Sequence, residues 1–143
     1  MQLKAMPPER LMAMVNSAKL LLEIGVHDLA GEIAAAEKHW NVAIHELEEA
    51  VRRQDALRYM EPPPWYFPER QALGAVLLRA GRPKQAEAVY REDLARNPGN
   101  GWALYGLAES LRAQKKTREA KAADTSFREA WARADVTLES SRP

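Results

Sequence analysis

The sequence contains no cysteine and has few of the residues that β-strands prefer. Without cysteine, the chain has no disulfide framework, no thiol nucleophile and no cysteine-ligated zinc or iron–sulfur site. Val, Ile and Thr together supply 13 of the 143 residues, whereas Ala supplies 25 and Leu 16. Because Ala and Leu are strong helix formers and β-branched residues favour strands, this composition predicts an all-α fold.

Long apolar runs are also missing. The longest run lies near Leu20–Leu22 and is far too short to cross a bilayer. The first ten residues, MQLKAMPPER, lack the apolar core of a signal peptide. The length is that of one domain. We therefore expect a single soluble domain located in the cytoplasm.

Neither sign of charge dominates the chain. Lys and Arg number 21, Asp and Glu number 20, and the net charge is +1. Residues 1–68 carry 7 bases and 10 acids, a net of −3, while residues 69–143 carry 14 bases and 10 acids, a net of +4. Because binding to polyanions depends on a concentrated basic surface, this balance disfavours a general nucleic-acid binder.

The sequence lacks the common signatures of catalysis and cofactor binding. It has no GxGxxG or GxxxxGK[ST] motif to hold a phosphate. His27, His39 and His45 are the three histidines, and no two lie four residues apart as in a zinc-binding helix. His45 lies near Glu46 and Glu49, which is either a weak divalent-cation site or an ordinary surface arrangement. We expect no enzyme activity, no cofactor and no metal.

A repeat of 34 residues underlies the abundant alanine. In the middle copy, Leu73, Gly74 and Leu77 share one helical face, and a second face begins at Ala86 and Tyr90. Between these faces Gly81 and Pro83 predict a turn, and after them Pro98 ends the unit. The equivalent positions 34 residues later are Leu107, Ala108, Leu111 and Ala120. The equivalent positions 43 residues earlier, across nine inserted residues, are Ala30, Gly31, Ala34 and Ala43.

This pattern resembles the tetratricopeptide repeat, in which each unit is an antiparallel pair of helices. The outer copies depart from it, since Asp55 and Ala132 replace the closing proline and Asp124 replaces the aromatic residue. The resemblance implies a single-domain helical repeat array, an α-α superhelix of about seven helices. We expect an N-terminal capping helix over 8–23 that ends near Gly25, repeat 1 over 27–55, a Pro/aromatic insertion over 56–66, repeat 2 over 67–98, repeat 3 over 101–135 and a loose tail over 136–143.

The resemblance also implies a binding surface, because the first helix of each pair lines the inner, concave wall of such an array. Its matching positions include Gln71, Trp102, Tyr105, Glu109 and Arg112. Trp, Tyr and Arg often dominate binding energy at interfaces, so these residues are candidate peptide anchors. Alternatively, Trp102 packs on the preceding repeat.

Family members that hold a terminal carboxylate resemble one another in using Lys, Asn and Arg on this wall. The matching places here contain Asp28, Glu32, Ala72, Trp102 and Gly106. We therefore expect the groove to take an apolar or mixed ligand rather than a carboxylate.

Two further segments are candidates for contact with partners. Trp65 and Tyr66 lie in the insertion PPPWYFP, which is either a proline-rich ligand or exchanging arm for another chain, or a linker whose aromatic rings fill the gap between repeats. The turn over residues 112–121 carries five basic residues, with Trp102 and Tyr105 before it.

Taken together, these patterns predict a non-enzymatic protein–protein interaction scaffold. Its partner is a peptide or protein on the concave face, or a second copy of this chain. The alternatives are a nucleic-acid-associated adaptor that uses the basic turn, and a regulatory or catalytic subunit with a small-molecule pocket between the insertion and Trp102.

Overall fold

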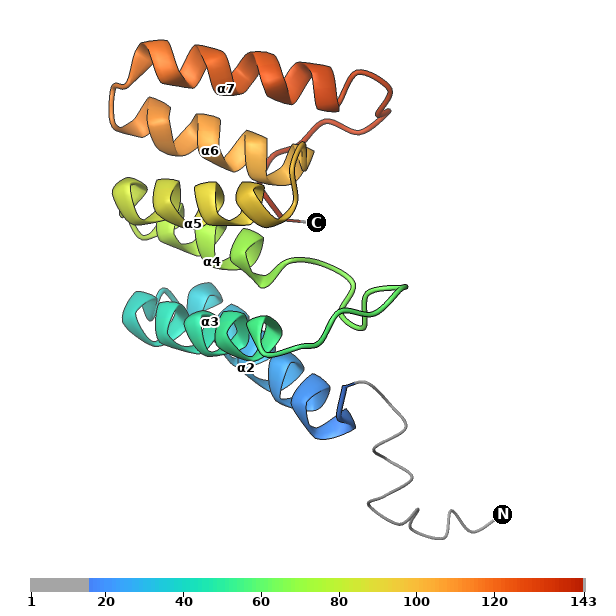
Figure 1. The fold of residues 1–143 in the computed structure, drawn as a ribbon. Helices are drawn as coiled ribbons and strands as arrows, with labels where there is room; N and C mark the ends of the chain where they lie inside the picture. Colours follow the sequence, from blue (N-terminus) through green and yellow to red (C-terminus); the bar gives the residue numbers. More distant parts are fainter. Residues whose placement is uncertain (1–15, 143) are drawn as a thin grey trace, which may run out of the picture.

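The computed structural model describes residues 16–142, which form six helices in three antiparallel pairs (Figure 1). The pairs are α2 (Ala18–Ala36) with α3 (Trp40–Asp55), α4 (Glu69–Arg79) with α5 (Pro83–Arg96), and α6 (Gly101–Ala113) with α7 (Thr117–Ala130). Helices adjacent in sequence pack together, and α4 also contacts α6. The predicted all-α repeat array is confirmed. Most of the expected helix over 8–23 lies outside the described residues.

The helices begin and end at local signals in the sequence. The Ser17 hydroxyl accepts a hydrogen bond from the Leu20 N–H at 3.1 Å before α2, and Asn100 caps α6 in the same way. Gly81 separates α4 from α5 with a φ of 71°, a left-handed conformation that suits glycine. Pro83 is the first residue of α5, where its missing N–H costs nothing.

Helix α2 does not end near Gly25 as predicted but continues to Ala36. The first helix of repeat 1 therefore begins at Ala18 rather than at 27. The reason lies in the insertion: a Cβ on Gly25 would stand 3.3 Å from Cη2 of Trp65. Gly25 thus makes room for an indole instead of ending a helix, and packing of α2 on α3 outweighs its low helix propensity.

Tyr90 lies at the centre of the core, where three helices meet. Its ring is fully buried between Gly74 of α4 and Gly106 of α6. A Cβ on Gly74 would stand 2.3 Å from the Tyr90 Cζ, and a Cβ on Gly106 would stand 2.2 Å from it. These two glycines let α4 and α6 approach both faces of the ring. The repeat therefore has a glycine on its first helix and a tyrosine on its second because the two residues pack against each other.

The insertion joins the first repeat to the second. Phe67 is buried in the core, and its carbonyl accepts a hydrogen bond from Gln54 Nε2 at 2.8 Å. Asp55 stands at the end of α3, where a closing proline was expected, and accepts two hydrogen bonds from Arg70 of α4 at 2.7 and 2.6 Å. The side chain of Arg70 is only 6% exposed, so this bidentate pair is a structural link between the repeats.

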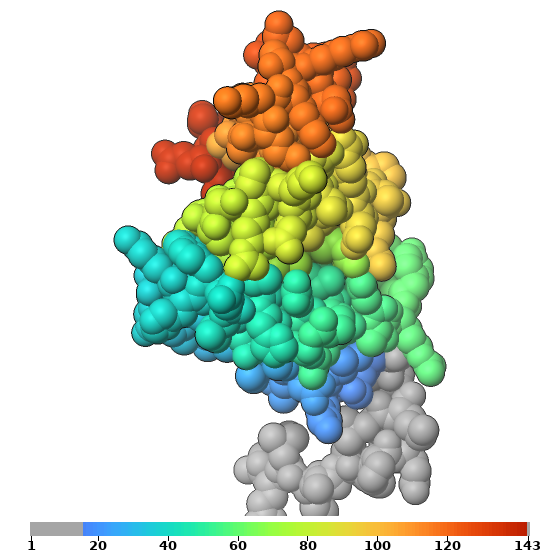
Figure 2. Space-filling model, turned by 90° about the vertical axis from the view of Figure 1, so that its left-hand side faces the viewer, coloured from blue at the N-terminus to red at the C-terminus, as the bar shows by residue number. Residues whose placement is uncertain are grey.

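The expectation of a loose tail is wrong for residues 136–142, which we call the return segment. After α7 the chain turns back past α6 towards α4 and α5 (red in Figure 1), and the same red atoms lie against one side of the array in Figure 2. Leu138 and Ser141 are buried, with exposed fractions of 8% and 2%. The segment has no helical period because it is irregular, with bends at residues 139–141, and contacts with other helices hold it in place.

Candidate functional site

The candidate site is the inner face of the array, formed by the first helices α2, α4 and α6. Between α4 and α6 this face contains a pocket of about 410 Å³, a size that suits ligands. Leu78 and Ala75 supply its apolar side, and Tyr105 and Glu109 supply its polar side. Glu139, Ser140 and Ser141 of the return segment also line it. The inner face therefore already holds a stretch of non-helical polypeptide.

Ser141 is the most tightly held residue of the return segment. Its Oγ lies 3.2 Å from the carbonyl oxygen of Gln71 in α4 and 2.5 Å from the Tyr90 hydroxyl of α5. A carbonyl oxygen can only accept, so the Ser141 hydroxyl donates to Gln71 and accepts from Tyr90. Burial raises the pKa of Tyr90, which keeps this phenol protonated as the donor.

Three carboxyl groups gather where the return segment reaches α2. Arg142 forms an ion pair with Glu32, and Asp28 lies one turn earlier on the same helix. Glu69, the first residue of α4, contacts Asp28 and accepts a hydrogen bond from Trp65 Nε1 at 2.5 Å. We call Asp28, Glu32 and Glu69 the acidic cluster.

Burial dominates the protonation of the acidic cluster. It raises the pKa of Glu69 to about 8, with the Asp28 charge as the next cause. Burial also raises the pKa of Asp28, and the charge of Arg142 opposes that shift. Glu69 is thus protonated near neutral pH and can share its proton with Asp28, while Glu32 faces the guanidinium.

The aromatic residues predicted on α6 lie along α7. Trp102 meets Trp131 edge-on with ring centroids 5.5 Å apart, and Tyr105 meets Phe127 at 5.6 Å. Trp102 is half-buried and packs on an aromatic ring of its own repeat. Tyr105 reaches the inner pocket as well, so it contributes to both surfaces.

The charged candidates on α6 form a network at the other end of this face. Arg112 pairs with Glu109 on its own helix and with Asp124 of α7 at 2.8 Å. Lys116 of the basic turn pairs with Glu87 at 2.7 Å. These carboxylates offset part of the positive charge of residues 112–121, which weakens the case for nucleic-acid binding through that turn.

The remaining predicted residues point in different directions. Gln71 is buried, and its side chain donates to Asp93 at 3.1 Å, so its backbone carbonyl rather than its side chain faces the inner surface. Trp65 is half-buried against Gly25, as described above. Tyr66 is 81% exposed, and its ring lies beside those of Phe67 and Trp65, with centroids 4.6 and 5.7 Å away.

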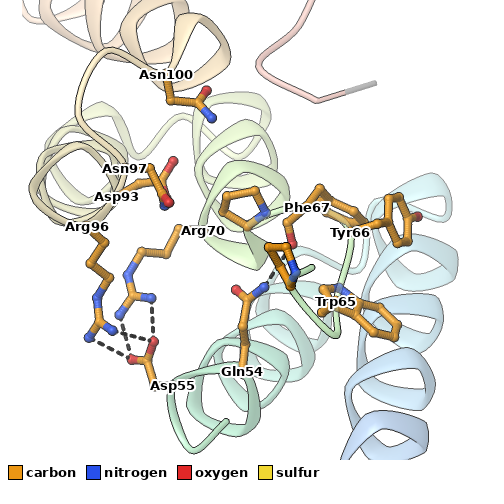
Figure 3. A pocket seen from close by; sticks show the side chains of 12 residues that line it. Gln54, Asp55, Trp65, Tyr66, Phe67, Arg70, Asp93, Arg96, Asn97 and Asn100 are labelled. Carbon is orange, nitrogen blue, oxygen red and sulfur yellow. Dashed lines mark hydrogen bonds and ion pairs between the residues drawn. The ribbon is translucent and has the colours of Figure 1, made fainter. Parts of the chain in front are cut away.

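A second pocket of about 370 Å³ lies beneath the insertion (Figure 3). Trp65, Tyr66 and Phe67 stand on one side of it, and Arg70 and Arg96 converge on Asp55 on the other. Trp102 does not line this pocket. The two guanidinium groups already bind Asp55, so their hydrogen-bond donors are partly used before a small molecule could enter.

Two searches of the described part of the chain were negative. Within residues 16–142, no group of three His, Asp or Glu side chains is placed to hold a metal ion. In the same range, no helix has the length and apolar character needed to cross a membrane.

Sequence reasoning missed the return segment and its receptors on the inner face. Glu32 and Asp28 were noted only because they replace the basic residues of a carboxylate-binding groove. Their acidity was the available signal, since it favours a basic ligand such as Arg142. No pattern in the sequence indicated Ser141, whose partners are a backbone carbonyl and a core tyrosine.

The geometry defines the class of this protein as an all-α helical repeat array. A family model described as tetratricopeptide repeat matches residues 77–123, from the end of α4 to within α7. The resemblance inferred from the sequence is thereby confirmed for the part of the chain that this model covers. No curated protein and no solved structure matches it.

Proposed function

We propose that this chain is a protein-interaction module that binds an extended peptide on its concave inner face. The observation that carries the proposal is that a non-helical segment already lies there: residues 139–141 line the inner pocket, and the side chain of Ser141 is buried. The pocket between α4 and α6 combines apolar, aromatic and acidic groups, which is the composition of peptide-binding grooves. Tetratricopeptide repeats in general mediate protein binding, and the match of residues 77–123 to that repeat supports the proposal.

A peptide-display selection tests this function. The full chain is offered a random peptide library, and the selected peptides are measured against two variants by fluorescence anisotropy. Ala113→Arg places a long charged side chain at the exposed edge of the inner pocket. Ala95→Arg makes the same change at an exposed position near the end of α5 and is the matched control.

We expect Ala113→Arg to weaken binding of the selected peptides about tenfold or more, a loss of at least about 1.4 kcal/mol. Ala95→Arg should leave their affinity unchanged. Equal affinities for the two variants would place the peptide site elsewhere and contradict the proposal.

Self-association is a second candidate, because α2 exposes an apolar stripe. Leu22, Val26, Leu29 and Ile33 are 70%, 64%, 62% and 52% exposed. Their spacings of four, three and four residues are those of a heptad seam, which favours another helix as the partner. Residues 16–142 leave this stripe uncovered, and an exposed stripe of this kind is costly in water, so we propose α2 of a second copy as its occupant.

Sedimentation equilibrium distinguishes this second candidate. Leu22→Lys combined with Leu29→Lys should shift the chain towards the monomer. The control is Val42→Lys at an exposed apolar residue of α3, and it should not shift the chain towards the monomer. A wild-type chain that stays monomeric at high concentration would eliminate self-association through this stripe.

A further inference from the structure

The contacts of the return segment describe the ligand that the inner face is built to accept. This inference rests on the proposed function and makes it more specific. Two residues carry it: Ser141, which is buried and doubly hydrogen-bonded, and Arg142, which is ion-paired. Glu139, two positions before Ser141, is exposed.

The Ser141 subsite selects a small hydroxyl group. Its two partners impose opposite roles, since the Gln71 carbonyl needs a donor and the neutral Tyr90 hydroxyl needs an acceptor. A serine satisfies both with one atom, whereas alanine satisfies neither. An aspartate cannot donate to the carbonyl once it is ionised, and its charge would be buried. The glycines on both sides of Tyr90 fix the phenol in this position.

The neighbouring subsite selects a positive charge. Glu32 binds the Arg142 guanidinium, and the charge of Arg142 also acts on Asp28. Because Glu69 can share its proton with Asp28, the negative charge that faces the cation comes from Glu32 and from Asp28. A guanidinium offers five N–H donors in a planar arrangement and can use several of them here.

We infer that the inner face recognises a peptide segment in which Ser is followed directly by Arg or Lys. Residues 138–142 are the intramolecular copy of this ligand, so a partner peptide has to displace them. Because the return segment is tethered, it competes at an effective concentration on the order of millimolar. The chain is therefore held in an occluded state until a partner of this chemistry outcompetes its own segment.

The test uses the full chain and a fluorescent peptide with the sequence of residues 135–143, DVTLESSRP. The opened variant is Ser141→Asp with Arg142→Glu, which disables the intramolecular ligand without touching the helices. The control variant is Thr137→Asp with Arg133→Glu, which makes the same charge change at two exposed positions. Binding is measured by anisotropy at physiological salt.

We expect the peptide to bind the opened variant about tenfold or more tightly than it binds the wild-type chain or the control. Equal affinity for all three chains would show that residues 136–142 do not occlude the face. Absence of binding to the opened variant would overturn the assigned ligand chemistry.

A charge exchange tests the basic subsite separately. Glu32→Arg in the opened variant should lose the peptide, and a peptide carrying Arg142→Glu should bind that variant better than the unmodified peptide does. Failure of this exchange would refute the pairing of Glu32 with Arg142.

The two levels of the proposal fail in different ways. If library peptides bind and depend on Ala113 while DVTLESSRP does not bind the opened variant, the proposed function stands and the present inference is wrong. If neither kind of peptide binds, the concave face is not a peptide site and both are wrong.

Discussion

Replacing Gly106 with alanine perturbs the packing on which the repeat array depends. The added Cβ would lie 2.2 Å from the Tyr90 Cζ, a distance far inside van der Waals contact. The ring cannot retreat, because Gly74 of α4 bounds its other face just as closely. The variant therefore has to separate α5 from α6 or move Tyr90 out of its buried position.

The cost follows from two opposing effects. Overpacking a core by one methyl group typically costs about 1–3 kcal/mol, and a trapped ring lies at the upper end of that range. Alanine recovers up to about 1 kcal/mol relative to glycine through helix propensity. We expect Gly106→Ala to lower the free energy of unfolding by about 2 kcal/mol.

Urea unfolding followed by far-UV circular dichroism measures this change. Gly25→Ala is the control, because its Cβ would meet only the far edge of the Trp65 indole at 3.3 Å. Gly25→Ala should lower the free energy of unfolding much less than Gly106→Ala does, or raise it slightly. A Tyr90→Leu background should reduce the penalty of Gly106→Ala, since the clash involves the ring. A Gly106→Ala chain as stable as the wild type would refute the packing argument.

Three further predictions concern charge and aromatic packing. The pKa of Glu69 is raised to about 8 from an ordinary value of 4.5, so the folded state retains a proton that the unfolded state loses, and stability should fall as pH rises from about 4.5 to about 8. Glu69→Gln should remove this slope and stabilise the chain at pH 8 by on the order of 3 kcal/mol in urea titrations; an unchanged slope would contradict the assignment. Hydrogen bonds from Arg70 lower the pKa of Asp55. The ionised Asp55 therefore stabilises the fold above its ordinary pKa, and this stabilisation is lost as pH falls. Asp55→Asn should cost about 2 kcal/mol at pH 7, because it leaves a buried guanidinium without its carboxylate, and a thermal melt indistinguishable from the wild type would argue against that link. Trp102→Ala with Tyr105→Ala should lower the melting temperature and weaken the near-UV dichroism, because both rings pack on aromatic side chains of α7; full retention of both signals would mean that this packing is absent.

The helix pairs could be predicted from the sequence because their determinants are periodic and local. Leu73, Gly74 and Tyr90 occupy fixed positions of the repeat, and packing between neighbouring helices requires a small residue opposite a large one. The same reasoning misjudged Gly25, because a glycine within a helix reads either as its end or as a place of close approach. Only the position of Trp65 decides between these readings.

The site was less predictable, because its contacts are long-range and involve the backbone. Ser141 donates a hydrogen bond to the backbone carbonyl of Gln71. Every residue has such a carbonyl, so the residue types do not indicate which one is the partner. Arg142 meets Glu32 across nearly the whole chain. Trp102 was correctly placed on α6, but whether it faces the inner wall or α7 depends on how the two helices cross, and periodicity does not determine that.

The central claim is that residues 136–142 lie on the inner face in the position of a bound peptide. Nuclear Overhauser spectroscopy on the full chain tests it most directly. We predict cross-peaks between the β-protons of Ser141 and the ring protons of Tyr90, because the two hydroxyl oxygens are 2.5 Å apart. Sharp signals from residues 136–142 without cross-peaks to Tyr90 or to α4 would contradict the account.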